Sequence, residues 1–146
     1  MSTSILYHAW GIVGYDYVST GFVEGRIEFK IRHRPSKLCC SKCRSSNVIL
    51  PGTKTRKFRG VPVGSKKVFF LLEVQRVECL VCGCCAQVDL RFADPHVSYT
   101  KGFERFALEL LRFATIDDVA RHLGISWDVV KDIQKRNLEG IMGTLV

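Results

Sequence analysis

The sequence predicts an α+β protein in which a β-rich N-terminal part precedes a helical C-terminal part. Strand-like alternation and all seven cysteines lie before Asp94-Pro95. After that point the sequence contains neither cysteine nor proline, and its apolar residues follow a helical period. We therefore expect two domains, residues 1–96 and residues 97–146.

The composition excludes several protein classes. Apolar residues make up 47% of the chain and charged residues 25%, which is typical of a globular protein rather than a disordered one. No apolar run approaches the ~20 residues that a membrane helix needs. The N-terminal stretch MSTSILYHAW lacks the basic start and long apolar segment of a secretory signal. These features predict a cytoplasmic protein.

The N-terminal part is expected to contain two pairs of strands. Residues 27–31 alternate apolar and charged side chains after a turn at Glu24-Gly25, which predicts a hairpin with one apolar face. The stretches 53–63 and 66–78 are also rich in β-prone residues. Pairing of these two stretches would bring the chain segments at their outer ends together.

Four of the seven cysteines form two matched pairs, Cys40-x-x-Cys43 and Cys79-x-x-Cys82, with 35 residues between the pairs. Two residues between cysteines let both thiolates face one ion from a tight turn. Two such turns supply the four sulfurs that structural Zn²⁺ binds in a tetrahedron. We predict a structural zinc site with these four ligands, which leaves no coordination position open for catalysis.

Other interpretations of the cysteines stay open. The four could be buried apolar residues, or the second pair could be redox-active, although no thioredoxin-like strand and helix surround it. Disulfides are not expected in a reducing compartment, and the count is odd. Cys39 competes with Cys40 for the ligand register. Cys84 and Cys85 follow the second pair, and all three extra cysteines are expected to pack or to remain free thiols.

Positive charge is concentrated in one block. Of the residues between Lys30 and Leu72, twelve are Lys or Arg and none is Asp or Glu, within a chain of formal net charge +8. Such a block suits phosphate backbones, although a merely solvated basic surface is the alternative. The phosphate contacts expected from it are Lys54, Arg56, Lys57, Arg59, Lys66 and Lys67.

Helical periodicity begins after residue 100. Apolar residues at steps of three and four predict a helix over residues 101–113, with Phe113 on its apolar face. Thr115 is followed three residues later by a carboxylate, which is typical of a capped helix start. The short helix that it begins is expected to end at Leu123, before Gly124.

A second helix is expected after Ser126, which is its capping residue, from Trp127 to about Leu138. Val130 and Ile133 should point inward, with Leu138 near them. A short helix, a glycine turn and a second helix form a helix-turn-helix, whose second helix reads the major groove of DNA. Packing of helices without DNA binding is the alternative, since residues 101–146 hold equal numbers of basic and acidic side chains. The contacts expected from this helix are Ser126, Trp127, Lys131, Gln134 and Lys135.

The order of these parts resembles the N-terminal region of insertion-sequence transposases of the ISL-three family. The likeness is carried by the stretch FRGVPVG at residues 58–64, by VFFLLEVQRVECLVCGC, and by VARHLGISWDVVKDIQKR. It covers nearly the whole chain and implies an N-terminal β-hairpin and zinc ribbon followed by a helix-turn-helix unit. The resemblance also implies that the cysteine pairs bind zinc and that residues 126–137 form the reading helix.

The resemblance further implies recognition of transposon ends in double-stranded DNA, at the nucleoid, with homodimerisation left open. Transposases of this family have a carboxylate-rich, metal-dependent catalytic domain downstream of the matching region. No three carboxylates of this chain form a plausible phosphoryl-transfer site, so we expect no catalytic residue and no enzyme activity from it alone. Two other functions remain open: a zinc module that binds proteins, and a zinc ribbon that binds RNA through its basic stretch.

Overall fold

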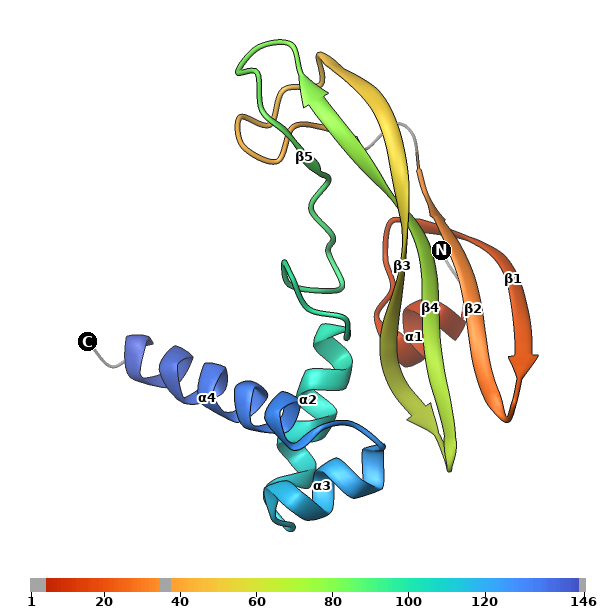
Figure 1. The fold of residues 1–146 in the computed structure, drawn as a ribbon, viewed down its shortest axis with the longest axis vertical. Helices are drawn as coiled ribbons and strands as arrows, with labels where there is room; N and C mark the ends of the chain where they lie inside the picture. The colour runs from red at the N-terminus through yellow and green to blue at the C-terminus, as the bar shows by residue number, and fades with distance from the viewer. Residues whose placement is uncertain (1–4, 35–37, 145–146) are drawn as a thin grey trace. The chain divides into compact units, whose positions relative to one another are not determined.

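The computed structural model describes residues 5–34 and 38–144 of the 146-residue chain (Figure 1). The chain forms two compact units, residues 1–102 and residues 103–146, which we call the β unit and the helical unit. This division lies a few residues later than the expected domain boundary after residue 96, which stays a prediction. The α+β class with strands first and helices second is confirmed.

The β unit is built on one sheet. Its strands are β1 (Tyr15–Val23), β2 (Arg26–His33), β3 (Val48–Val63), β4 (Lys66–Cys79) and β5 (Cys85–Gln87). The strand order is β1-β2-β4-β3, with β5 pairing with the end of β4 (Figure 1). Neighbouring strands are antiparallel except β2 and β4, which run parallel from Ile27 beside Val68 to Ile31 beside Leu72. The sequence did not predict this parallel pair.

Both expected strand pairs are present. β1 and β2 form the hairpin, and its turn residues Glu24 and Gly25 both have positive φ, 49° and 75°, as tight hairpin turns require. β3 pairs with β4 in antiparallel register over most of its length. Both strands are longer than expected. β3 begins at Val48 rather than near residue 53, and β4 continues to Cys79, one residue past its expected end.

The core of the β unit lies on one face of this sheet. Phe58, Phe70 and Val74 are fully buried in it. The short helix α1 (Ile5–Trp10) lies where the sequence shows no clear period, and it adds Trp10 to the core. The Trp10 indole packs against the Phe70 ring, with 5.9 Å between the ring centres, and donates to the Val61 carbonyl at 2.9 Å. A hydrogen bond between distant segments, not local periodicity, therefore holds this end of the chain.

The segment between β5 and residue 101 runs from β5 to α2 (Figure 1), and its last residues pair with β3 at Arg59. The Arg59 N–H donates to the Ser98 carbonyl at 2.8 Å, and the Thr100 N–H donates to the Arg59 carbonyl at 2.9 Å. Phe92 packs edge-on against Phe58 at 5.1 Å. The segment thereby covers part of the core without being a regular strand.

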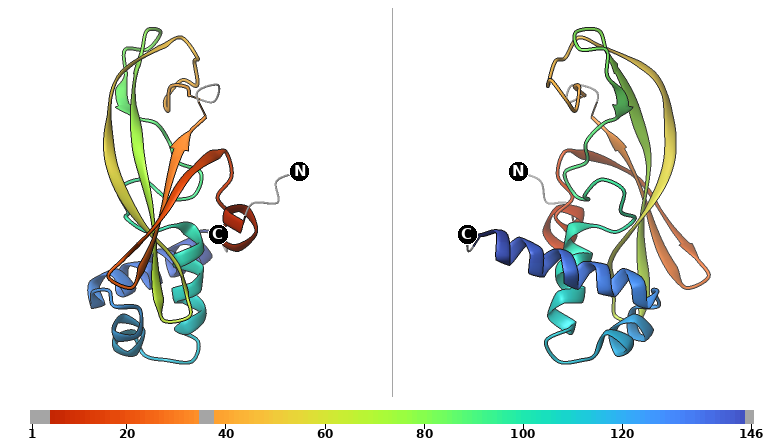
Figure 2. Two further views of the ribbon diagram at one scale, coloured as in Figure 1. Left: turned by 90° about the vertical axis from the view of Figure 1, so that its right-hand side faces the viewer. Right: turned by 60° about the vertical axis from the view of Figure 1, so that its left-hand side comes forward.

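The helical unit holds α3 (Ile116–Leu123), α4 (Trp127–Thr144) and most of α2 (Lys101–Leu110), shown from two sides in Figure 2. Its buried side chains come from all three helices: Phe103, Ala107, Val119, Ala120, Leu123, Val130 and Ile133. The inward placement expected of Val130 and Ile133 is confirmed, since both are 0% exposed. α4 continues well past its expected end near residue 138.

Two predicted core positions in this unit are wrong. α2, the first helix of this unit, ends at Leu110. The Arg112 and Phe113 N–H groups donate to the carbonyls of Glu109 and Leu110, three residues earlier, which tightens the last turn. Phe113 is consequently turned outward and is 86% exposed. Leu138 is 54% exposed because it lies at the rim of a groove with Leu108 rather than in the core.

Candidate metal centre and nucleic-acid interface

The two cysteine pairs lie in two turns with the same hydrogen bonds. In each turn the backbone N–H groups two and three positions ahead donate to the first sulfur, at 3.4 and 3.5 Å to Cys40 Sγ and at 3.4 Å for both to Cys79 Sγ. The N–H of each first cysteine donates to the carbonyl five positions ahead, that of Ser45 and that of Cys84, both at 2.9 Å. The sequence spacing therefore folds into two copies of one local structure.

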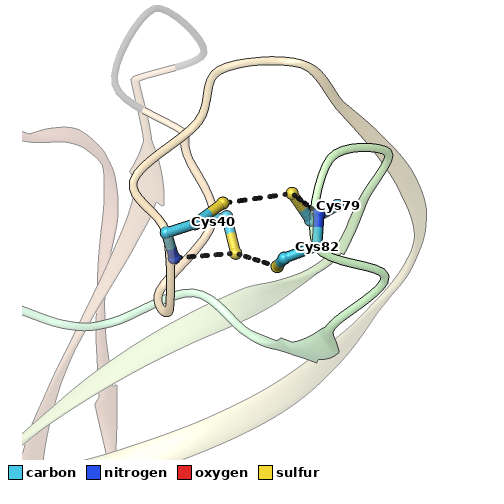
Figure 3. Close-up of side chains that lie close together, drawn as sticks. Cys40, Cys79 and Cys82 are labelled. Carbon is cyan, nitrogen blue, oxygen red and sulfur yellow. Dashed lines mark hydrogen bonds between the residues drawn. The ribbon is translucent and has the colours of Figure 1, made fainter.

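The four sulfurs converge on one point (Figure 3). Cys40 Sγ lies 3.6 Å from Cys82 Sγ, Cys43 Sγ lies 3.4 Å from Cys79 Sγ, and all four lie within 4.8 Å of one another. Sulfurs at the corners of a tetrahedron with Zn–S bonds of about 2.3 Å are about 3.8 Å apart. The donor set and its spacing fit a tetrahedral, thiophilic metal ion.

Strand pairing brings the two turns together. β3 begins shortly after the first turn and β4 runs into the second, and their register places Val48 opposite Cys79. The Leu80 N–H also donates to the Asn47 carbonyl at 3.1 Å. Most of the residues between the two cysteine pairs thus lie in one antiparallel pair of strands.

The hydrogen bonds of the turns prepare two of the thiols for ionisation. The N–H groups of Cys43 and Lys42 lower the pKa of Cys40 to about 6. The N–H of Cys82 is the main cause of a lowered pKa at Cys79. Metal binding requires thiolates, so backbone donors aimed at these sulfurs stabilise the form that binds.

The other two thiols show the effect of crowding. The Ser45 N–H lowers the pKa of Cys43. Hydrogen bonding of the Cys43 thiol with the Cys79 sulfur, together with burial, outweighs this effect and raises the pKa of Cys43 to about 12. The pKa of Cys82 is also raised, although the N–H of Cys84 lowers it, because burial and contact with the Cys40 sulfur oppose ionisation. Four thiols this close cannot all ionise without a cation among them. The four cysteines are thus arranged as a group that could hold a metal ion.

The extra cysteines lie outside this cluster. Among the described residues, the group of neighbouring ligand atoms consists of the four sulfurs above. Cys39 and Cys84 are half-buried and Cys85 is exposed, with the Arg76 guanidinium 3.6 Å from the Cys85 sulfur. This placement favours Cys40 over Cys39 in the ligand register.

The predicted phosphate contacts of the β unit differ in exposure. Lys54, Lys66 and Lys67 are exposed, with the first on β3 and the other two at the start of β4. Lys57 is exposed in part and forms an ion pair of 3.1 Å with Glu28. Three of the six side chains therefore extend into solvent without a partner of opposite charge nearby in the described residues.

The two predicted arginines of β3 are held by the protein. The Arg56 guanidinium donates to the Val97 carbonyl at 2.9 Å and lies over the Phe58 ring at 4.7 Å. Arg59 is 7% exposed, and burial lowers its pKa. Arg56 thus presents a fixed guanidinium, whereas Arg59 has little surface to offer.

The helix-turn-helix has the expected capping. Thr115 Oγ1 accepts from the Asp118 N–H at 3.1 Å, and the Asp118 carboxylate accepts from the Thr115 N–H at 3.4 Å, which is a capping box. Gly124 ends α3 with φ of 67°, and the Ile125 N–H donates to the Ala120 carbonyl at 3.0 Å. Such a glycine lets the chain reverse within one residue.

The second helix exposes most of its predicted contact residues. Trp127, Lys131 and Lys135 are exposed, with the Lys131 ammonium 5.2 Å from the centre of the Trp127 ring. Ser126 Oγ accepts from the Val129 N–H at 3.3 Å, so this hydroxyl caps α4. Gln134 is half-buried in the groove beside α2.

Comparison with known protein families agrees with both halves of this geometry. Residues 37–82, which include all four clustered cysteines, match the zinc-finger of transposase IS204/IS1001/IS1096/IS1165. Residues 88–136 match the helix-turn-helix domain of transposase family ISL3. Over these two regions the chain belongs to the ISL3 transposase family. The searches found no match among curated proteins and none among solved structures.

Membership of the ISL3 family gives the two structural parts their names. The cysteine cluster with β3 and β4 is the zinc-finger, and α3 with α4 is the DNA-binding helix-turn-helix. Sequence reasoning missed the left-handed residues after each cysteine pair, Arg44 and Gly83, with φ of 63° and 73°. A glycine directly after the second pair was the available signal. No helix in the described part of this ISL3-family chain has the length and apolar character needed to cross a membrane.

Proposed function

We propose that this chain binds double-stranded DNA at transposon ends, in a sequence-specific and zinc-dependent manner. The observation that carries the proposal is the α3–Gly124–α4 arrangement, in which a capped second helix has an apolar inner face and an exposed outer face. That arrangement inserts a helix into the major groove. Its occurrence beside a transposase zinc-finger supports transposon ends as the target.

The two units would divide the work. In the helical unit, α4 exposes Asp128 and Asp132 beside Lys131 and Lys135. The opposite charges offset one another, so this helix has little net attraction for phosphate. The exposed lysines of the β unit would supply that attraction, which depends on salt but not on sequence. Base contacts from Trp127, Lys131, Gln134 and Lys135 would supply the specificity.

Zinc would act as a structural cofactor held by Cys40, Cys43, Cys79 and Cys82. Bound there, a tetrahedral ion closes its coordination shell with protein sulfurs and stabilises the β unit. These residues would hold together the turn before the start of β3 and the turn at the end of β4, and the two strands carry the basic side chains. Loss of the ion is therefore expected to weaken DNA binding through loss of folded structure.

The deciding experiment measures binding of the zinc-loaded chain to duplexes from each side of its coding region, with scrambled duplexes as controls, over a salt series. Preference for one flanking end with a steep salt slope is expected. Equal binding to every duplex would reject transposon-end recognition. Preference for single strands would point to the RNA-binding alternative, and absence of binding would point to a protein partner for exposed Trp127 and Phe113. Sedimentation in the same buffer tests whether the chain forms a homodimer, which the sequence leaves open.

A further inference from the structure

A cleft of about 740 Å³ lies in the β unit, and all of its lining residues belong to that unit. Its walls come from β3, from β5 and from the segment that leads to residue 101, with Ser41 of the first cysteine turn also at its edge. This volume falls within the range of about 300–1,000 Å³ that is usual for small-molecule sites. Of its lining residues, the proposed DNA binding uses the exposed Lys54 and gives the apolar residues and the returning segment no role.

Basic side chains reach this cleft from two directions. Lys54 and Arg56 come from β3, whereas His96 and Lys101 come from the returning segment. Arg56 is fixed there by the Val97 carbonyl, so its guanidinium is oriented before any ligand arrives. A preorganised guanidinium loses little entropy on binding an anion.

Two carboxylates also line the cleft. Asp89 is exposed, and Asp94 lies 3.9 Å from the Lys101 ammonium. The permanent cations still outnumber these carboxylates, so the lining has a net positive charge before His96 is counted. The carboxylates and the Gln87 amide add acceptors that could bind exocyclic amino groups of a base.

The remaining wall is apolar. Val88, Leu90, Ala93 and Pro95 line it, and Val88 and Ala93 are buried. An inorganic anion would gain nothing from such a wall, and a purely apolar ligand would leave Lys54 and Arg56 without an anion. A ligand with a flat apolar part and an anionic part matches both halves of the lining.

We propose that this cleft binds a nucleoside phosphate, with the base against the apolar wall and the phosphate between Lys54, Arg56 and Lys101. The nucleotide could be an unpaired or terminal unit of a DNA strand, or a free mononucleotide. In the first case the proposal rests on the proposed DNA binding and gives the β unit a contact with one strand that duplex docking alone does not provide.

The test uses the full zinc-loaded chain and NMR titration of its backbone amides. The probes are inorganic phosphate, deoxythymidine monophosphate and a short single-stranded oligodeoxynucleotide. We expect the nucleotide or the oligonucleotide to shift amides within residues 86–101, and phosphate alone to bind more weakly. Response to the mononucleotide identifies a free nucleotide as sufficient, whereas response to the oligonucleotide alone identifies a DNA strand as the source.

Lys54→Gln and Lys101→Gln each remove one cation, and each is expected to weaken nucleotide binding about tenfold, as loss of one charged hydrogen bond does. Lys30→Gln is the matched control, because Lys30 is an exposed lysine of β2 outside the cleft. Thermal unfolding checks that all three variants are folded. Absence of shifts in residues 86–101, equal binding of phosphate and nucleotide, or unchanged affinity in both cleft variants would overturn the proposal.

Failure of this inference is distinguishable from failure of the proposed function. Duplex preference for a flanking end without nucleotide binding in the cleft rejects the cleft alone. Nucleotide binding in the cleft without any duplex preference rejects transposon-end recognition and leaves a nucleotide site. The two measurements use different probes on the same preparation.

Discussion

Arg44 and Gly83 occupy equivalent positions, each directly after the second cysteine of its turn. The N–H of Arg44 donates to the Cys40 carbonyl at 3.0 Å, and that of Gly83 donates to the Cys79 carbonyl at 3.1 Å. Both have left-handed φ, 63° and 73°. Glycine adopts this conformation freely, whereas a residue with a Cβ is strained in it. The two turns therefore have the same backbone geometry, but only the Arg44 turn carries backbone strain.

Exchanging the residue types at these positions should change stability in opposite directions. Gly83→Ala is expected to lower the free energy of unfolding by about 1 kcal/mol through backbone strain. A steric clash does not contribute, because the added Cβ would meet no atom within 4 Å. Arg44→Gly is expected to raise it by about 0.5 kcal/mol. Urea unfolding of the zinc-loaded chain measures both. Destabilisation by both substitutions would show that the Arg44 side chain stabilises its turn.

Removal of a ligand should abolish the metal site. Cys40→Ser or Cys79→Ser is expected to lose stoichiometric zinc and to unfold the β unit, because such a site contributes folding free energy. Cys39→Ser and Cys85→Ser are matched controls from neighbouring positions outside the cluster and should keep one zinc per chain. Elemental analysis with circular dichroism measures the outcome, and full zinc retention in both ligand variants would refute the ligand set.

The capping box predicts a pH effect in the helical unit. The Thr115 hydroxyl, donating to the Asp118 carboxylate at 2.9 Å, is the main cause of a lowered pKa at Asp118. A carboxyl whose pKa is lowered by folding stabilises the fold above its unfolded pKa, and that contribution is lost as pH falls through the folded value. Thr115→Ala should therefore raise the pKa of Asp118. Separately, loss of the N-cap hydroxyl should cost about 1 kcal/mol of stability at neutral pH.

NMR titration of the Asp118 carboxyl in both proteins measures the change. Thr115→Ser is the control, because it keeps the hydroxyl and should leave the pKa of Asp118 low. An unchanged pKa in Thr115→Ala would mean that Arg121, whose guanidinium lies 3.0 Å from the Asp118 carboxylate, is the dominant partner.

Gly60 should be required by the packing of Phe70. A Cβ at position 60 would lie 2.5 Å from Phe70 Cε2, and the Phe70 ring is 0% exposed. Gly60→Ala is therefore expected to cost about 1–3 kcal/mol, as overpacking of a core does. Gly52→Ala lies on the same strand, where a Cβ meets no atom within 4 Å, and should have a small effect. Equal denaturation midpoints for the two variants would contradict this account.

Charge neutralisation should separate affinity from specificity. Lys67→Gln is expected to weaken binding to all duplexes alike and to reduce the salt slope by about one unit. Lys131→Ala should instead reduce the preference for the target over scrambled duplex, by about 1–3 kcal/mol if it contacts a base edge. Binding isotherms at several salt concentrations distinguish these effects. A loss of preference in Lys67→Gln would assign base reading to the β unit.

Features that depend on neighbouring residues could be predicted from the sequence. The cysteine spacing specified two turns of the same kind, because two intervening residues already set the turn and its N–H···S hydrogen bonds. Thr115, Gly124 and Ser126 specified the ends of α3 and α4, since capping uses backbone groups within a few residues. The hairpin turn at Glu24-Gly25 is another local case.

Features that depend on distant segments were decided by the tertiary structure. The parallel pairing of β2 with β4 joins strands far apart in sequence, and no local pattern specifies such a partner. Burial of Arg59 follows from the return of residues 97–100 along β3, and exposure of Leu138 follows from the path of α4 beside α2. The sequence by itself determined which turns, caps and ligands could form, because their energies are local. Only the fold decided which charges face solvent, because burial depends on what packs against each side chain.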